Sequence, residues 1–255
     1  AEIDGANVDG AVTVDVQAVN AGGITARALS GFVGVAGNTA HDAVTARIAG
    51  AAVGGTQAVG AVTVRAVSQG SYSATGKAAT NLLTGDTVAA VEDSHVTAAL
   101  SAAQMLAGLD AVTVEAIDLL KASADTTPVL ADVAALVVDV TLQAAVARNT
   151  VNHTTTAHVS DAVVSATAGS IAVTAIAERR LRATTLATQV SESTPPIQNF
   201  ALSLGGVYAE NRIRGDVSAY AEGSTLTTAG SGDVRLSASD NSAIDATTEL
   251  SGVAT

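Results

Sequence analysis

Val62-Thr-Val-Arg-Ala66, followed by Tyr72-Ser-Ala74, is the stretch that decides the fold. Its apolar and small residues fall on every second position, which is the period of a β-strand whose side chains alternate between two faces. The same spacing returns four more times along the chain, so the pattern is an internal repeat rather than a local accident. Its copies begin at Val14, Val62, Val112, Ile171 and Val234.

A second pattern precedes four of these copies. It begins at an asparagine and continues with small or apolar residues, or Thr and Ser, at offsets of 6, 8, 10, 13 and 15. The starting residues are Asn38, Asn81, Asn149 and Asn211. The step from offset 10 to offset 13 is odd and therefore predicts a corner, where one strand stops and the next begins. We expect the four asparagines to stack along one corner, where Asn tolerates left-handed backbone and its amide can bond to the next copy. The first repeat lacks its asparagine half, so we expect the chain to begin inside a unit.

Short strands, tight corners and a regular repeat predict an all-β fold, a single-chain parallel β-helix or β-solenoid, with a right-handed coil expected. One continuous domain over 1–255 contains units at about 1–29, 30–75, 76–124, 140–184 and 200–247, with inserts at 125–139 and 185–199. We expect each unit to hold two or three coils of roughly 20 residues, giving about 12 coils and a rod of about 60 Å. Propensity leaves room for a short helix at 101–106, whereas the β-branched residues of 129–146 favour strand.

The composition supports a thin interior. Hydrophobic residues make up 48% of the 255 residues, charged residues 14% and aromatic residues only 2%. Such a chain is too apolar for disorder, and its alanines and valines fill a narrow space between sheets. The absence of cysteine excludes disulfides and thiolate metal sites. A net charge of −12 argues against a nucleic-acid partner, and no apolar run is long enough to predict a transmembrane helix.

The titratable residues form no recognisable catalytic or metal-binding pattern. His153 and His158 are five apart, so they point to opposite faces of a strand, and Asp161 is their one local partner for zinc. We interpret both histidines as solvent-facing. The basic cluster Arg179, Arg180 and Arg182 is interpreted as an exposed edge, with contact to an acidic neighbouring subunit as the alternative. We therefore expect no enzyme activity and no catalytic, cofactor-binding or metal residues.

Calcium is the one cofactor that the sequence leaves open. Acidic residues fall on or near expected turns, where carboxylates can collect calcium. No regular acidic nonapeptide accompanies them, so solvated corners are the preferred interpretation. These residues are Glu92, Asp93, Asp233, Asp240 and Asp245.

The repeats resemble those of large secreted filamentous adhesins of the leukotoxin-like and haemagglutinin-like type. The resemblance is best at Gly205-Gly-Val-Tyr-Ala-Glu-Asn211, followed by Val217-Ser-Ala219, Ser224 and Val234-Arg-Leu236-Ser-Ala238, and next best from Phe32 to Asn38. It implies an extracellular or bacterial cell-surface location and a structural role. The chain shows neither a secretion-signal domain nor a membrane-anchor barrel, which departs from that family.

The leading functional expectation is a structural extracellular filament or surface-fibre subunit, a homo-oligomer that assembles end to end through its open strand edges. The main alternative is the shaft of a large adhesin with a carbohydrate or cell-surface partner. A β-helical polysaccharide lyase or hydrolase lacks its expected cluster of charged residues. Ice binding comes last, because the proposed outward threonine row of Thr13, Thr63 and Thr113 does not continue.

Overall fold

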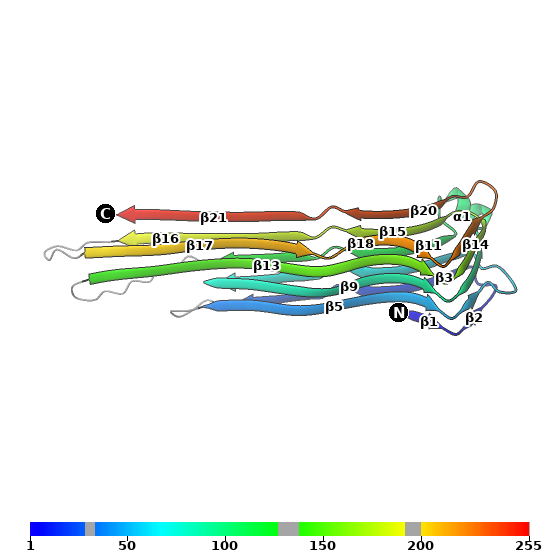
Figure 1. Ribbon diagram of the computed structural model, residues 1–255, viewed down its shortest axis with the longest axis horizontal. Coiled ribbons are helices and arrows are strands. Elements are labelled where there is room, and N and C mark those ends of the chain that lie inside the picture. The colour runs from blue at the N-terminus through cyan, green and yellow to red at the C-terminus, as the bar shows by residue number, and fades with distance from the viewer. Residues whose placement is uncertain (29–33, 127–137, 192–199, 255) are drawn as a thin grey trace.

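The computed structural model describes residues 1–28, 34–126, 138–191 and 200–254. In this part of the chain it consists of parallel β-strands and one short α-helix (Figure 1). The strands belong to four open sheets, which we name A to D. The all-β prediction and the parallel pairing are therefore confirmed.

Each sheet collects strands from widely separated parts of the sequence. Sheet A contains β1 (Glu2–Asp4), β5 (Val35–Ala49), β9 (Ala78–Glu92), β13 (Val138–Ser160), β17 (Phe200–Arg214) and β18 (Val217–Glu222). Sheet B contains β2 (Asn7–Val8), β6 (Ala52–Val53), β10 (His95–Ala99), β14 (Val163–Ala168) and β19 (Thr225–Thr228). Sheet C contains β3 (Thr13–Asn20), β7 (Ala61–Ser68), β11 (Val112–Asp118), β15 (Ile171–Ala177) and β20 (Val234–Asp240). Sheet D contains β4 (Gly23–Arg27), β8 (Ser71–Gly76), β12 (Lys121–Thr126), β16 (Arg180–Ser191) and β21 (Ala243–Ala254).

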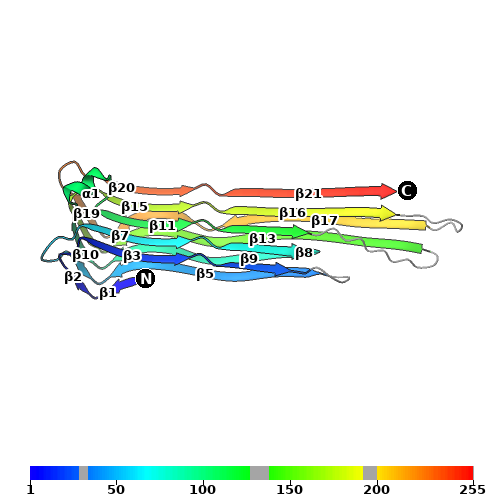
Figure 2. The ribbon, with the colours of Figure 1, turned by 180° about the vertical axis from the view of Figure 1, so that it is seen from behind.

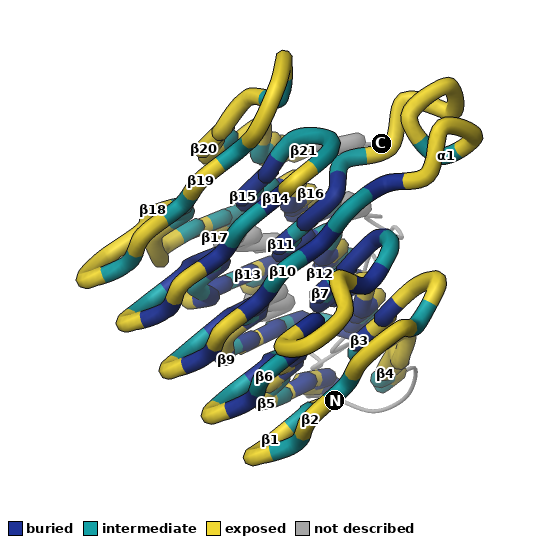
Figure 3. The backbone as a smooth tube through the Cα atoms, turned by 90° about the vertical axis from the view of Figure 1, so that its right-hand side faces the viewer, coloured by how far each residue is buried: buried dark blue, intermediate teal, exposed yellow. Residues whose placement is uncertain are grey.

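The chain visits the sheets in the order A, B, C, D and then returns to A. One such circuit is called a pass below; pass 1 runs through β1–β4, pass 2 through β5–β8, pass 3 through β9–β12, pass 4 through β13–β16 and pass 5 through β17–β21. Each pass stacks on the one before it, and Figure 3 shows this stacking end-on. Equivalent residues of successive passes therefore lie side by side, although they are far apart in the sequence.

The repeat that begins at Val14, Val62, Val112, Ile171 and Val234 forms one column in sheet C. Val62 pairs with Val14 on one side and Val112 on the other, and the column continues through Ile171 to Val234. The outward position next to it holds Asp15, Thr63, Thr113, Ala172 and Arg235. Thr13 pairs with Ala61 instead, so the expected threonine row was misaligned by two residues.

The size of one turn of the chain was predicted wrongly. Each repeat unit makes a single pass through all four sheets instead of two or three small coils, because the four long strands of sheet A (β5, β9, β13 and β17) have 15 to 23 residues. The longest axis of the molecule consequently runs along the strands and not along the stack (Figures 1 and 2). Five strand positions spaced about 4.8 Å apart span only about 20 Å, so the expected rod of 12 coils is not formed.

The interior changes character along the strands. Where sheets A, B and C meet, a continuous cluster of Val, Ile and Ala side chains fills the space, with Ile48, Val64 and Val114 among its buried members. Each buried Val or Ile side chain stabilises the fold by about 1.5–3 kcal/mol. Farther along, where sheet A faces sheet D, a separate cluster consists of alanines only. Its buried members are Ala36, Ala74, Ala79, Ala124, Ala147 and Ala183. The thin interior expected from the composition lies here.

The corner between sheets A and B explains the odd step in the asparagine repeat. The residue that follows each sheet A strand has a positive φ in all five passes: Gly5, Gly50, Asp93, Asp161 and Gly223. Left-handed backbone turns the chain sharply, and Gly and Asp tolerate it better than most residues. The Oγ atoms of Ser94 and Ser224 brace the same corner, since each accepts a backbone N–H from the preceding pass.

The sequence also makes predictions for three further segments. The short helix forms as α1 (Ala102–Leu106), capped at its N-terminus by Ser101, whose side chain accepts the Gln104 N–H. Residues 138–146 are strand, as favoured, while 127–137 lie outside the described residues. Of the expected insert at 185–199, residues 185–191 continue β16 and pair with β21, and the remainder lies outside the described part.

Candidate functional site

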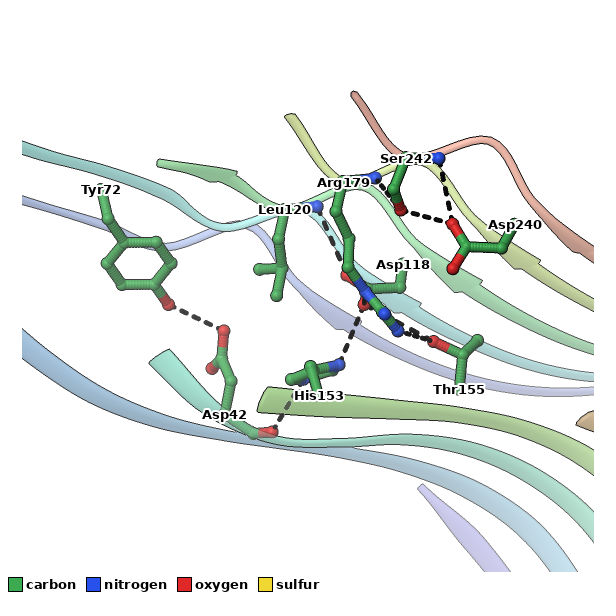
Figure 4. A network of polar contacts seen from close by, with 9 residues as sticks. All are labelled: Asp42, Tyr72, Asp118, Leu120, His153, Thr155, Arg179, Asp240 and Ser242. Atoms are coloured by element: carbon green, nitrogen blue, oxygen red, sulfur yellow. Dashed lines mark hydrogen bonds and ion pairs between the residues drawn. The ribbon is translucent and has the colours of Figure 1, made fainter. Parts of the chain in front are cut away.

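A cluster of charged and polar side chains is buried where sheets A, C and D meet (Figure 4). Asp118 ends β11, Arg179 lies between β15 and β16, and His153 and Thr155 come from β13. The side chains of Asp118, His153 and Arg179 have no solvent exposure at all. Burial of charges is costly unless they are paired, so this cluster is the most unusual chemical feature of the described interior.

Asp118 lies at the centre of the cluster. Its Oδ2 accepts a hydrogen bond from Arg179 Nε at 2.6 Å and lies 3.0 Å from His153 Nδ1. The histidine contact is close but lacks the alignment of a hydrogen bond. Asp118 Oδ1 accepts the backbone N–H of Leu120 at 3.3 Å, and Arg179 Nη2 donates to Thr155 Oγ1 at 3.0 Å. One carboxylate thus joins strands from passes 3 and 4.

Two opposing effects set the pKa of Asp118. Burial alone would raise it, because a charged carboxylate loses its hydration. The contacts with His153 and Arg179 outweigh burial, and the pKa of Asp118 is lowered from its ordinary value of 3.8. Asp118 is therefore a carboxylate at neutral pH and compensates the buried guanidinium.

A second carboxylate extends the cluster toward pass 2. Asp42 Oδ2 accepts the Tyr72 hydroxyl at 2.8 Å, and Asp42 Oδ1 accepts the Asn20 amide. Burial and the bond to Asp42 raise the pKa of Tyr72, so its hydroxyl remains a donor. The main-chain oxygen of Asp42 lies 3.3 Å from His153 Nε2, so the imidazole ring lies between the Asp118 carboxylate and the Asp42 backbone (Figure 4).

Glycine makes room for these large polar side chains. In one column of sheet A, Asp42 and His153 alternate with Gly85 and Gly215 in successive passes. Both glycines have a positive φ, of 146° and 116°. A Cβ atom on Gly85 would lie 1.8 Å from the Asp42 oxygen, and one on Gly215 would lie 2.1 Å from the His153 oxygen. The alternation of large and absent side chains therefore follows from close backbone approach.

The chemistry open to the cluster is restricted by its burial. An aspartate beside a histidine can act as an acid–base pair when a substrate reaches it. Here the ring and the carboxylate are sealed between sheets, so in this conformation the groups act on one another. What the arrangement does is hold charge in fixed positions and tie sheets A, C and D together.

The asparagines of the repeat form a ladder through the interior (hereafter the Asn ladder). Asn38 Nδ2 donates to Asn81 Oδ1 at 2.8 Å, Asn81 to Asn149 at 2.7 Å, and Asn149 to Asn211 at 2.7 Å. Each amide also donates across the interior to a carbonyl oxygen of sheet D in its own pass. The accepting residues are Ser73, Ser123, Arg182 and Asp245.

The location of the Asn ladder differs from the expectation. The four residues do stack, but within the long strands of sheet A and not at a corner, and none of them has a positive φ. Their positions follow from hydrogen bonding and not from a left-handed backbone. An inward amide can satisfy both itself and a facing carbonyl because the space between sheets A and D is so narrow.

The burial of two histidines and one arginine differs from the prediction. His153 is fully buried instead of solvent-facing. His158 points outward yet is largely covered, since its Nε2 lies 2.9 Å from Glu92 Oε1 and its ring stacks on Tyr220 with centroids 5.2 Å apart. In the basic cluster Arg180 and Arg182 are exposed as expected, whereas Arg179 is buried.

The signal for the buried histidine was present in the repeat. His153 follows Asn149 by four residues, an even offset that places both side chains on the same face of a strand. Asn149 belongs to the repeated inward set, so His153 had to face inward too. No comparable rule marks Asp118 or Arg179, because their partners come from other passes.

The acidic residues near corners have structural partners. Asp93 provides the left-handed corner residue, and Asp240 Oδ1 accepts the Ser242 N–H two residues later. Glu92 contacts both His158 and Arg47. Among the described residues, no group of three or more His, Cys, Asp or Glu side chains is placed to hold a metal ion.

A shallow groove lies between α1 and the loop at 229–232. Its volume is about 380 Å³, and Met105, Leu109, Gly169 and Ser231 line it together with other small residues. None of its lining residues is titratable. The groove therefore offers a mixed polar and apolar surface without a titratable group.

No protein-family model, curated protein or solved structure matches this chain. Within the described residues, no helix has the length and apolar character needed to cross a membrane.

Proposed function

We propose that the chain is a segment of a β-solenoid, a single-chain parallel β-helix with a right-handed coil, and that its function is structural. In this proposal it forms part of an extracellular filament or bacterial surface fibre by adding further passes to its stack, end to end. The buried cluster around Asp118 then serves to hold the sheets in register, in place of a catalytic role.

One observation carries the proposal: in sheet C the last pass exposes apolar positions that every earlier pass buries. Val62, Val64, Val112 and Val114 have no exposure, whereas their equivalents in β20, Val234 and Leu236, are 39% and 45% exposed. Ile244 and Leu250 in β21 are 55% and 56% exposed. Inward apolar residues along open strand edges are the features that recruit a further strand layer.

The first pass of a second copy fits this surface by its register. If β3 added to β20 as β7 adds to β3, Val14 and Val16 would cover Val234 and Leu236. The outward residue Asp15 would then lie beside Arg235, so opposite charges would meet at the joint. A head-to-tail contact of this kind does not close on itself and produces a fibre.

The location is proposed from the same features. Stacked small-residue repeats and the absence of cysteine match what the resemblance to secreted filamentous adhesins implies. A net charge of −12 limits side-by-side association of fibres.

The test is assembly of a variant with a charge on the exposed edge. Leu236→Lys places an ammonium among inward apolar groups, and Ser237→Lys places the same charge on the exposed outward face of the same strand as a matched control. Sedimentation velocity over a concentration series and electron microscopy would measure assembly. We expect fibres for the wild type and for Ser237→Lys, and single particles for Leu236→Lys.

Two outcomes would contradict end-to-end assembly. One is a wild-type chain that stays a single particle at every concentration. The other is equal loss of assembly in both lysine variants, because a general charge effect would then explain the result.

A second candidate function is the shaft of a glycan- or cell-binding adhesin. It is favoured by one observation: Tyr208 and Tyr220 lie on the outer face of sheet A and are 52% and 38% exposed. Aromatic faces can stack on sugar rings. Glycan-array binding that is lost in Tyr220→Ala and retained in Ser218→Ala would support this candidate, and absence of any glycan signal would remove it.

A further inference from the structure

The cations on the outer face of sheet D lack carboxylate partners. Lys121 in β12 and Arg180 and Arg182 in β16 are exposed, and so is Arg27 in β4. Within the described parts of the chain, none of these four side chains forms an ion pair or a hydrogen bond. The protein therefore leaves the positive charge on this face uncompensated.

The outer faces of sheets A and C differ from sheet D. Among the arginines in their described strands, Arg214 alone has no carboxylate partner. The paired ones are Arg47 with Glu2 and Glu92, Arg65 with Glu115, Arg148 and Arg212 with Glu210, and Arg235 with Asp110. The chain has 24 acidic and 12 basic residues, so a shortage of carboxylates does not explain the unpaired cations of sheet D.

The strand register brings two of these cations together. Lys121 is the direct partner of Arg180 in the pairing of β12 with β16. Neighbouring strands lie about 4.8 Å apart, and two like charges at such a separation repel one another. The carboxylates on the same face are Glu178, Asp125 and Asp245, and in the described structure none of them is within ion-pair distance of either cation. A partner with two negative charges at a similar spacing would remove the repulsion.

Two carboxylates of the same chain have that spacing. Asp93 and Asp161 are the left-handed corner residues between sheets A and B in passes 3 and 4. The Asp93 N–H donates to the Ser160 oxygen, so the two corners stack directly on one another. Both side chains are exposed and, within the described residues, have no hydrogen bond or ion pair. Figure 3 shows that the corners between sheets A and B follow one edge of the molecule.

We propose that the Lys121 and Arg180 pair on sheet D binds the Asp93 and Asp161 pair at the corner of a second copy of this chain. Each pair has one member on pass 3 and one on pass 4. Two copies whose stacks run parallel therefore bring all four side chains together without a shift along the stack.

Net charge favours this single arrangement of two copies. Because each copy carries a charge of −12, two copies repel one another in most orientations. The arrangement that places the acidic corner on sheet D opposes unlike charges, so electrostatics selects it over the others. The contact uses different surfaces of the two copies, and it therefore leaves one corner and one sheet D face free to continue sideways.

The side contact does not depend on the ends of the stack. Passes 3 and 4 both have a described pass on either side. The contact goes beyond the end-to-end assembly proposed above and does not require it. Exposed ion pairs contribute at most about 1 kcal/mol each, so the contact between two copies is weak and its test must record brief encounters.

Carbodiimide crosslinking provides such a test, because it joins a lysine amine to a carboxylate in direct contact. Lys77 and Lys121 are the two lysines of the chain, so few products are possible. A mixture of nitrogen-15-labelled and unlabelled chains at low ionic strength should give peptides that join Lys121 of one chain to Asp93 or Asp161 of another. Mass spectrometry identifies them. In about 0.5 M salt their yield should fall, because salt screens exposed charges.

Three variants locate the contact. Arg180→Gln keeps Lys121 but removes half of the positive pair, and it should lower the yield by a factor of about two to five. Arg214→Gln removes an exposed, unpaired cation of sheet A and changes the net charge equally, so it is the matched control and should keep the wild-type yield. Asp93→Asn combined with Asp161→Asn should abolish the product, and asparagine preserves the corners because it tolerates left-handed backbone.

Four results would overturn the proposal. They are absence of the interchain product at low ionic strength, a yield that salt does not change, equal losses in Arg180→Gln and Arg214→Gln, and crosslinks from Lys121 to carboxylates scattered over the surface. The last result would indicate random collisions. Fibres without the crosslink would contradict the side contact alone, whereas single particles that give the crosslink would contradict end-to-end assembly alone.

Discussion

At the scale of single residues, the close packing of the strands in sheet A requires glycine at certain positions. Gly85 and Gly215 lie against the main-chain oxygens of Asp42 and His153. These contacts explain why glycine occurs in strands, where it ordinarily weakens pairing.

Gly85→Ala should destabilise the protein by roughly 1–3 kcal/mol or more, because alanine is strained at a φ of 146° and its Cβ would clash with the Asp42 oxygen. Urea unfolding followed by circular dichroism measures the loss. Gly206→Ala is the matched control, since Gly206 has an ordinary φ and a Cβ atom added there would meet nothing within 4 Å. Equal effects of the two substitutions would refute the steric explanation.

The buried charges give the second residue-scale prediction. Asp118→Asn leaves the Arg179 guanidinium without its counterion and should cost about 3–5 kcal/mol. Glu115→Gln, on the same strand, removes an exposed ion pair to Arg65 and should cost at most about 1 kcal/mol. The free energy of unfolding of the two variants provides the comparison.

The pH dependence follows from the lowered pKa of Asp118. In the unfolded chain this carboxyl titrates near 3.8, and in the folded chain it titrates lower. Its stabilising contribution is therefore fully present above the unfolded value and is lost as the pH falls through the folded value. We expect the stability of the wild type to fall below about pH 4, and Asp118→Asn to reduce that slope. An identical acid slope in both proteins would show that other carboxylates control acid unfolding.

At the scale of elements, the Asn ladder ties sheet A to sheet D between two apolar clusters. One consists of alanines, and the other includes Tyr72, Leu83 and Leu181. Alanine methyl groups bury little area, so on that side hydrogen bonds across the interior contribute more of the cohesion. The ladder has a direction, because every amide donates toward the later pass.

Asn149→Leu should lower the free energy of unfolding by about 2–4 kcal/mol, because it leaves the Asn81 donor and the Arg182 acceptor without partners in the interior. Asn211→Leu at the end of the ladder should cost less, since Asn211 is half-buried and water reaches its neighbours. Thermal unfolding of both variants tests the difference. An equal loss of stability in Asn211→Leu and Asn149→Leu would contradict this role of the hydrogen bonds.

At the scale of the whole molecule, each pass is stabilised chiefly by its two neighbouring passes. Passes 2 to 4 have neighbours on both sides, whereas pass 5 has one. Stacked repeats of this kind behave as a row of units coupled to their nearest neighbours.

Amide hydrogen exchange should therefore be slowest in β7, β11 and β15 and fastest in β20, within the same sheet. Mass-spectrometric exchange at low protein concentration measures this order. In assembled fibres, β20 should gain protection, whereas the middle strands should change little. Uniform exchange along sheet C would contradict stepwise coupling of the passes.

The part of the site that the sequence could reveal is the part that repeats. Even offsets place Asn149 and His153 on one face, and five copies of one spacing align Val62 with Val112. The partners of Asp118 could not be found in this way, because Arg179 and His153 reach it from another pass. A buried contact between passes has no fixed separation in sequence.

By itself the sequence determined that the chain is built of strands, where the corner between sheets A and B falls, and which residues stack from unit to unit. These properties are local, since alternation along a strand and the backbone freedom of Gly and Asp at a corner act over a few residues. The tertiary structure alone decided that one unit makes one pass, that the long axis follows the strands, and that charges are paired inside. These three features depend on how long the strands are that face one another across the interior. The spacing of residues within one strand does not contain that information.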